Sequence, residues 1–136
     1  MADNYPAAAG KHTEDCQVLL SASHFDGAGY LAGYAVECVV KALVQLEGAV
    51  PWGHDLGKLT RKAVYLASLP SQKTMKYVTH PNVTTLTYGP PTGWDEKVRY
   101  KAPGAVSEAT ASAWVAEAQR LYREVIVAMK LDGVRL

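Results

Sequence analysis

The composition of this chain contains few signals of compartment or covalent chemistry. It has only two cysteines in 136 residues, Cys16 and Cys38, and both lie within apolar helical patterns, where a free thiol behaves as a small hydrophobe. Two such cysteines make no disulfide framework, so a reducing compartment is expected. The first fifteen residues lack a basic stretch followed by an apolar one and do not resemble a signal peptide. We therefore expect a cytoplasmic protein.

An excess of charge of one sign is also missing. The chain has 14 Lys and Arg against 13 Asp and Glu, which gives a formal net charge of +1. A net charge of this size does not attract nucleic acid by itself, although it does not exclude a local basic patch. The length fits one domain that buries roughly two-thirds of its unfolded surface.

Spacings typical of metal and cofactor sites are absent from the sequence. The two cysteines are too scattered for a zinc site, and the histidines have no ligand spacing. These histidines are His12, His24, His54 and His80. No glycine-rich phosphate loop follows a strand pattern, and neither cysteine has a basic neighbour that would activate its thiol. We expect no metal and no cofactor.

The most informative stretch that is present runs from Tyr30 to Leu46, YLAGYAVECVVKALVQL. It is apolar on almost every side, which predicts a helix wrapped by other helices. Its exceptions recur every four residues and form one stripe, made of Gly33, Glu37, Lys41 and Gln45. The run is shorter than the about 20 uncharged residues that span a bilayer, so no membrane span is expected. The stretch predicts the central helix of a soluble bundle.

The sequence before this helix predicts a tail and one further helix. Residues 1–11 contain Pro6 and Gly10 and are expected to form a flexible N-terminal tail. A first helix is predicted from about 13 to 23, antiparallel to the central one. Asp26 is the expected N-cap of the central helix.

Two more helices and a long excursion follow. Asp55 is expected to cap a short helix that runs to about Ala67, before Pro70. The clearest amphipathic pattern predicts a last helix over 107–130, with Ser107 as N-cap. Together these patterns predict an all-α, up-and-down antiparallel bundle of four to five helices over residues 12–132.

The excursion before the last helix, about 69–106, is rich in proline and turn signals. A structureless loop of that length is uncommon in a compact domain. We expect a short helix near 72–78, an extended segment or small strand over 83–88, and a turn of helix around 94–100. Trp94 is the expected plug that seats the excursion on the bundle.

The central helix is one of several motifs that occur in a recognisable order. Its core reads Tyr-x-x-x-Tyr-Ala-x-Glu-Cys-x-x-Lys from Tyr30 to Lys41, followed by His54-Asp55-Leu56, Trp94, Arg99-Tyr100 and an amphipathic helix. Over about residues 12–130 this order resembles the HEPN (higher eukaryotes and prokaryotes nucleotide-binding) domain family. The resemblance implies a helical bundle that is usually a homodimer. Many members are metal-independent RNases, or toxins paired with a nucleotidyltransferase-type partner protein.

One departure from the family bears on activity. Its RNases share an Arg followed after four to six residues by a His, near the start of the last long helix. No Arg of this chain stands in that relation to a His, and Arg99 is followed at those distances by Gly104, Ala105 and Val106. Attack by a 2′-OH needs a proton acceptor near neutral pH and a cation over the phosphate. A non-catalytic domain is therefore expected.

The ligand-binding candidates are Glu37, Lys41, His54, Arg99 and Tyr100. Glu37 and Lys41 form either a structural ion pair or a groove in which Glu37 pairs with Arg99 and Lys41 holds a phosphate. Arg99 and Tyr100 suit a phosphate and a base, or else anchor the excursion. For His54, a bond to Glu37 or to the backbone is favoured over a catalytic dyad with the neighbouring aspartate.

Two classes of function remain open on the sequence. The favoured one is a domain that binds nucleic acid, nucleotide or a partner protein, in a toxin–antitoxin or nucleotidyltransferase-associated system. The alternative is an enzyme, either a divergent metal-independent RNase that combines Arg99 with a histidine brought close by folding, or a subunit that completes a partner's site. Tyr30 and Tyr34, one turn apart, are expected to be core or dimer contacts.

Overall fold

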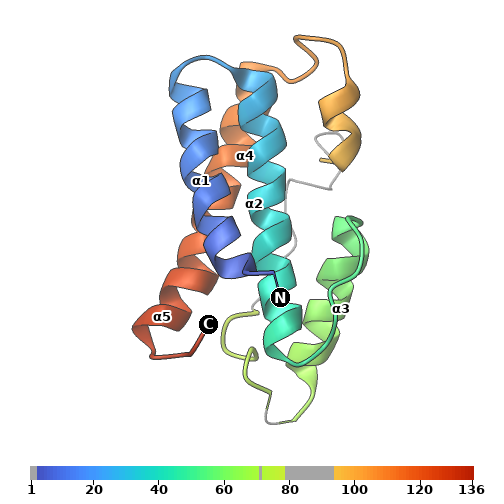
Figure 1. The fold of residues 1–136 in the computed structure, drawn as a ribbon, viewed down its shortest axis with the longest axis vertical. Helices are drawn as coiled ribbons and strands as arrows, with labels where there is room; N and C mark the ends of the chain where they lie inside the picture. Colours follow the sequence, from blue (N-terminus) through green and yellow to red (C-terminus); the bar gives the residue numbers. More distant parts are fainter. Residues whose placement is uncertain (1–2, 71, 79–93) are drawn as a thin grey trace.

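The structure is a computed structural model that describes residues 3–70, 72–78 and 94–136. Its elements are α1 (Tyr5–Ser21), α2 (Phe25–Leu46), α3 (Leu56–Ser68), η1 (Glu96–Tyr100), α4 (Glu108–Leu121), η2 (Tyr122–Val127) and α5 (Ala128–Leu131). Helices α1, α2 and α4 pack side by side, while α3 and η1 contact α2 on its other side (Figure 1). The described residues include no strand, so the predicted all-α bundle is confirmed.

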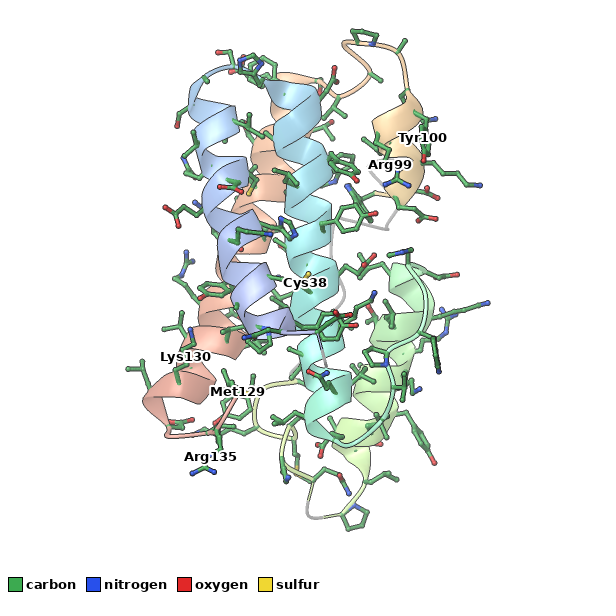
Figure 2. The ribbon with its side chains drawn as sticks, in the orientation of Figure 1. Cys38, Arg99, Tyr100, Met129, Lys130 and Arg135 are labelled. Atoms are coloured by element: carbon green, nitrogen blue, oxygen red, sulfur yellow. The ribbon has the colours of Figure 1, made fainter. Side chains whose placement is uncertain are left out.

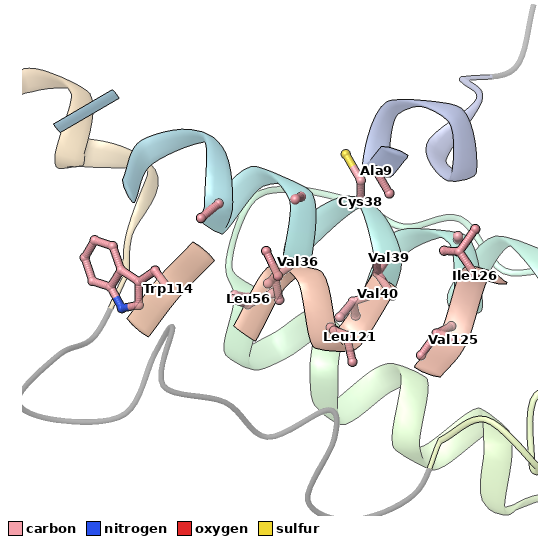
Figure 3. Close-up of a cluster of buried hydrophobic side chains, with 14 of the residues drawn as sticks. Ala9, Val36, Cys38, Val39, Val40, Leu56, Trp114, Leu121, Val125 and Ile126 are labelled. Atoms are coloured by element: carbon pink, nitrogen blue, oxygen red, sulfur yellow. The ribbon is translucent and has the colours of Figure 1, made fainter. Parts of the chain in front are cut away.

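Helix α2 forms the centre of the hydrophobic core. By length and composition alone it could cross a membrane, but 78% of its most apolar window is buried inside the protein, as in the core helix of a bundle. Figure 3 shows Val36, Val39 and Val40 of α2 in one buried cluster with Leu121 of α4 and Ile126 of η2. The predicted packing of the last helix along the central one is therefore confirmed.

Helix α1 begins earlier than the sequence pattern indicates. The prediction of a flexible tail over residues 1–11 is wrong from Tyr5 onward. The side chain of Asn4 accepts a hydrogen bond from the Ala7 N–H at 3.1 Å, and Pro6 lies in the first turn, where its missing N–H is not needed. Glycine suits position 10 of this helix because the Tyr122 side chain packs against it. A Cβ added at Gly10 would lie 2.9 Å from the Tyr122 hydroxyl oxygen.

The caps of the later helices follow the sequence in two cases out of three. Asp55 accepts from the Lys58 N–H at 3.0 Å and Ser107 accepts from the Thr110 N–H at 3.1 Å, so both predicted N-caps are confirmed. The predicted cap at Asp26 is wrong, because α2 already begins at Phe25.

The Asp26 carboxylate holds the loop before α4 instead. It accepts hydrogen bonds from the backbone N–H groups of Gly104 at 2.8 Å and Val106 at 3.0 Å. These two bonds lower the pKa of Asp26 below its ordinary value, because they stabilise the charged carboxylate. Asp26 thus connects the first turn of α2 to the start of α4.

The excursion between α3 and α4 differs in part from its prediction. The helix predicted near 72–78 is wrong, since residues 73–77 form turns. The Glu47 carboxylate, at the end of α2, accepts from the Lys73 N–H and from both the N–H and the hydroxyl of Thr74. The extended segment predicted over 83–88 lies outside the described residues. The predicted turn of helix around 94–100 is confirmed as the 3₁₀ helix η1.

Candidate functional site

A stripe of polar and aromatic side chains follows α2 on the side where it meets η1 and the start of α3. Steps of three and four residues place the α2 members on one helix face. We call the whole group the polar seam; it consists of Tyr30, Tyr34, Glu37, Lys41, His54, Trp94 and Arg99.

The Glu37 carboxylate is the electrostatic centre of the seam. It is 2% exposed, and its Oε2 lies 3.3 Å from Lys41 Nζ and 3.0 Å from His54 Nδ1. Its Oε1 has no hydrogen-bond partner among the described residues. Of the two partners expected for His54, the backbone or Glu37, the structure has Glu37, whereas the alternative in which Glu37 pairs with Arg99 is wrong.

Lys41 is covered rather than open to a ligand. It is 7% exposed, and its ammonium lies 5.5 Å from the ring centroid of Tyr5 on α1, in a cation–π contact. Glu37 and Lys41 are therefore a buried ion pair, which was one of the two interpretations of their spacing. Lys41 is not on the surface that a phosphate reaches.

His54 combines a fixed ring with an open edge. A carboxylate paired with Lys41 only accepts hydrogen bonds, so Nδ1 of His54 is the donor to Glu37, and Nε2 is the ring nitrogen that stays open. The His54 side chain is 53% exposed. The backbone of His54 is held by its position directly before Asp55, the N-cap of α3, and the His54 ring is held by its bond to Glu37.

Aromatic rings fill the seam around Tyr34. The Tyr34 ring centroid lies 4.9 Å from that of Tyr30, 5.2 Å from that of Trp94 and 6.0 Å from that of His54. Burial, together with a hydrogen bond to Tyr30, raises the pKa of Tyr34 above its ordinary value. The expectation that Tyr30 and Tyr34 are packing contacts agrees with this geometry, and Trp94, 4% exposed, is the predicted plug.

His12, on α1, is a neighbour of the seam that the sequence patterns do not single out. Its ring centroid lies 6.3 Å from that of Tyr34, and its Nδ1 is buried without a partner among the described residues. Burial, and then the charge of Lys11, lower the pKa of His12. A lone histidine in a helix carries no pattern of its own, so only the packing of α1 on α2 reveals this contact.

Arg99 forms the exposed end of the seam, and Tyr100 lies beside it on η1 (Figure 2). Arg99 Nη1 donates to the Tyr30 hydroxyl at 3.2 Å, and this bond raises the pKa of the guanidinium. The guanidinium carbon lies 4.8 Å from the centroid of the Tyr100 ring, and Tyr100 is 73% exposed. Both side chains face solvent beside the buried part of the seam.

A cavity of about 230 Å³ lies between the start of α3 and η1. Its lining includes His54 and Trp94 of the seam. The other lining residues are Asp55, Leu56, Gly57, Asp95, Glu96 and Lys97. The structure thus joins Glu37, Lys41, His54 and Arg99 into one seam and places Tyr100 at its end. In the described parts of the chain, no group of three His, Cys, Asp or Glu side chains is placed to hold a metal ion.

Comparisons with known proteins identify the family of this chain. No curated protein and no solved structure matches the chain. The model of the HEPN domain family matches residues 7–128, which include every residue of the polar seam. The chain belongs to the HEPN domain family.

Proposed function

We propose that this HEPN domain is a non-catalytic module that binds a nucleotide or RNA phosphate at the exposed end of the polar seam. The observation that carries the proposal is the exposed pair of Arg99 and Tyr100, held in place by Tyr30. One guanidinium N–H group is used on Tyr30, so others remain to bind a phosphate in a bidentate manner. The exposed Tyr100 ring offers a flat surface to a base.

The proposal of a non-catalytic role rests on the separation of cation and base. Arg99 donates to Tyr30, whereas His54 contacts Glu37 and Tyr34, and within the described part of the chain the guanidinium and the imidazole make no contact with each other. Cleavage of RNA needs a proton acceptor and a cation at the same phosphate. An arrangement in which the cation and the base make no contact favours binding over cutting.

Binding is tested by the fluorescence anisotropy of a labelled RNA oligomer and of a labelled adenosine nucleotide. Arg99→Ala removes the exposed guanidinium and is expected to weaken binding by about 10- to 150-fold, which corresponds to a hydrogen-bonded charge worth about 1.5–3 kcal/mol. Arg123→Ala is the matched control, since Arg123 is an exposed arginine on η2, outside the seam. Equal binding by the native chain and the Arg99 variant would contradict the proposal.

The orientation of His54 favours one second candidate, a divergent metal-independent RNase. A buried carboxylate that fixes Nδ1 and leaves Nε2 open is an arrangement that general bases use. RNA cleavage in the presence of EDTA that is lost in His54→Gln, with folding retained, would support this candidate. That outcome would also contradict the non-catalytic role.

A further inference from the structure

The outer face of α3 carries a line of cations that ends in a tyrosine. Lys58, Arg61, Lys62 and Tyr65 follow one another at steps of three, one and three residues and are all exposed, so they form one stripe about 10 Å long. We call these four residues the basic stripe. The opposite face of α3, which includes Leu56, Leu59 and Ala63, is buried against the bundle.

No salt bridge among the described residues neutralises the charge of the basic stripe. Helix α3 contains no acidic residue, and neither Lys58 nor Arg61 forms an ion pair within the described part of the chain. The carboxylate nearest in sequence, that of Asp55, accepts from the Lys58 backbone N–H as the helix cap. The stripe therefore presents free cations to a negatively charged partner.

The loop that carries Trp52 is tied to this stripe. The carbonyl of Val50 accepts from Lys62 Nζ at 3.0 Å and from the Trp52 N–H at 3.1 Å, so the loop that carries Trp52 is tied to α3. Trp52 is 80% exposed and Tyr65 is 63% exposed. Exposed rings next to cations are typical of surfaces that stack bases while they hold the phosphates of the same strand.

The basic stripe continues toward the exposed end of the polar seam. The start of α3 and η1 line the same cavity of about 230 Å³, with Lys97 at its edge. In the two segments that meet at this cavity, residues 54–65 and 94–101, the cations outnumber the carboxylates by six to three, and all six cations are exposed. The cations are Lys58, Arg61, Lys62, Lys97, Arg99 and Lys101, and the acids are Asp55, Asp95 and Glu96. The carboxylates of Asp55 and Asp95 each accept a backbone N–H hydrogen bond as helix N-caps.

We infer that the basic stripe and Trp52 form a second contact surface, and that the ligand is a single-stranded polynucleotide that runs from Arg99 across the cavity edge to Tyr65. The η1 end of this path rests on the proposed function. A single strand is favoured over a duplex because the exposed rings need unpaired bases to stack on. Charge complementarity and the ring positions select this occupant.

The experiment measures the anisotropy of a labelled single-stranded RNA of about 15 nucleotides over a series of salt concentrations. Lys58→Ala with Arg61→Ala is expected to make the slope of log K against log salt shallower by about 1.4, or about 0.7 for each lost phosphate contact. Trp52→Ala is expected to weaken binding between about five- and about 150-fold through the loss of stacking. The matched control is Lys130→Ala with Arg123→Ala, which removes one exposed lysine of α5 and one exposed arginine of η2, and is expected to leave the slope unchanged, since α5 lies across the bundle from α3 (Figure 1).

The outcomes separate this inference from the proposed function. If Arg99→Ala weakens binding but the basic stripe and Trp52 variants behave like the native chain, the second surface is wrong and the proposed function stands. If the native chain binds the adenosine nucleotide but no oligomer, the inferred path is wrong and the proposed function stands; if it binds neither, both are wrong. If duplex RNA competes as well as the single strand, the assignment of a single strand is wrong. All substituted side chains are exposed, and circular dichroism verifies that each variant is folded.

Discussion

The indole ring of Trp94 lies directly on Gly33 of α2, at a place where any Cβ would overlap the ring. Trp94 is 4% exposed and stands two residues before η1. The contact therefore decides where η1 and its Arg99 are held against the bundle. Glycine is required at position 33 for this close approach of helix and ring.

Gly33→Ala tests this packing of the Trp94 ring on Gly33. The added methyl group is expected to push the indole ring out and to lower the free energy of unfolding by about 1–3 kcal/mol, as overpacking of a core does. Urea unfolding followed by circular dichroism measures the change. Gly57→Ala in α3 is the control, because its Cβ would meet nothing closer than 3.4 Å and alanine favours a helix. If Gly33→Ala and Gly57→Ala were equally stable, the close packing of Trp94 on Gly33 would be contradicted.

The buried pair of Glu37 and Lys41 gives a second prediction. Glu37→Gln leaves the Lys41 ammonium buried without its carboxylate and is expected to lower the free energy of unfolding by about 3–5 kcal/mol. The double variant Glu37→Leu with Lys41→Met removes both charges and is expected to be near the native stability. Chemical denaturation of the three chains measures both effects. A single variant as stable as the double one would show that the pair is not buried as described.

Asp26 gives a prediction about pH. Because the pKa of Asp26 is lowered in the folded state, its contribution is present above the unfolded value near 3.9 and is lost as the pH falls through the lower folded pKa. Asp26→Asn is expected to cost about 1 kcal/mol at neutral pH and progressively less below about pH 4. Unfolding curves from pH 7 to pH 2 measure this difference. Asp15→Asn, at an exposed position of α1 without such bonds, is expected to show neither effect.

The two cysteines are predicted to be unreactive in the folded protein. Burial raises the pKa of Cys16 and of Cys38 to about 11, so both thiols stay protonated near neutral pH. Iodoacetamide at pH 8, read by mass spectrometry, is expected to label them only after urea is added. Because the folded pKa is raised, stability falls as the pH rises from about 8.5 through about 11. Rapid labelling of the native chain would contradict their burial.

The sequence predicted the helices wherever apolar periodicity was strong. The central helix and the caps at Asp55 and Ser107 follow from residue type and spacing, whereas the bond between His54 and Glu37 was one of two alternatives that the sequence left open. The family resemblance brought together the residues of the seam, since local patterns alone give no distance between α2 and η1. Trp94 was predicted as a plug because a large ring beside turn residues is best buried.

The errors occurred where a distant contact decides the role of a residue. Gly10 looks like a helix breaker, but the Tyr122 ring on η2 needs the space that it leaves. Asp26 has the chemistry of an N-cap, yet its partners are N–H groups 78 and 80 residues further along. Arg99 is within reach of Tyr30 rather than Glu37 only because Trp94 seats η1 where it does. Long-range packing sets such pairings, and the local sequence does not encode them.

The most direct test of the proposed ligand site is an NMR titration of the isotope-labelled chain with a single-stranded RNA oligomer. The account predicts chemical-shift changes that are concentrated at His54, along η1 around Arg99 and Tyr100, and on the outer face of α3. It predicts little change on the faces of α1 and α4 that lie away from the polar seam. Shifts confined to α1 and α4, or no shifts at a saturating RNA concentration, would contradict it.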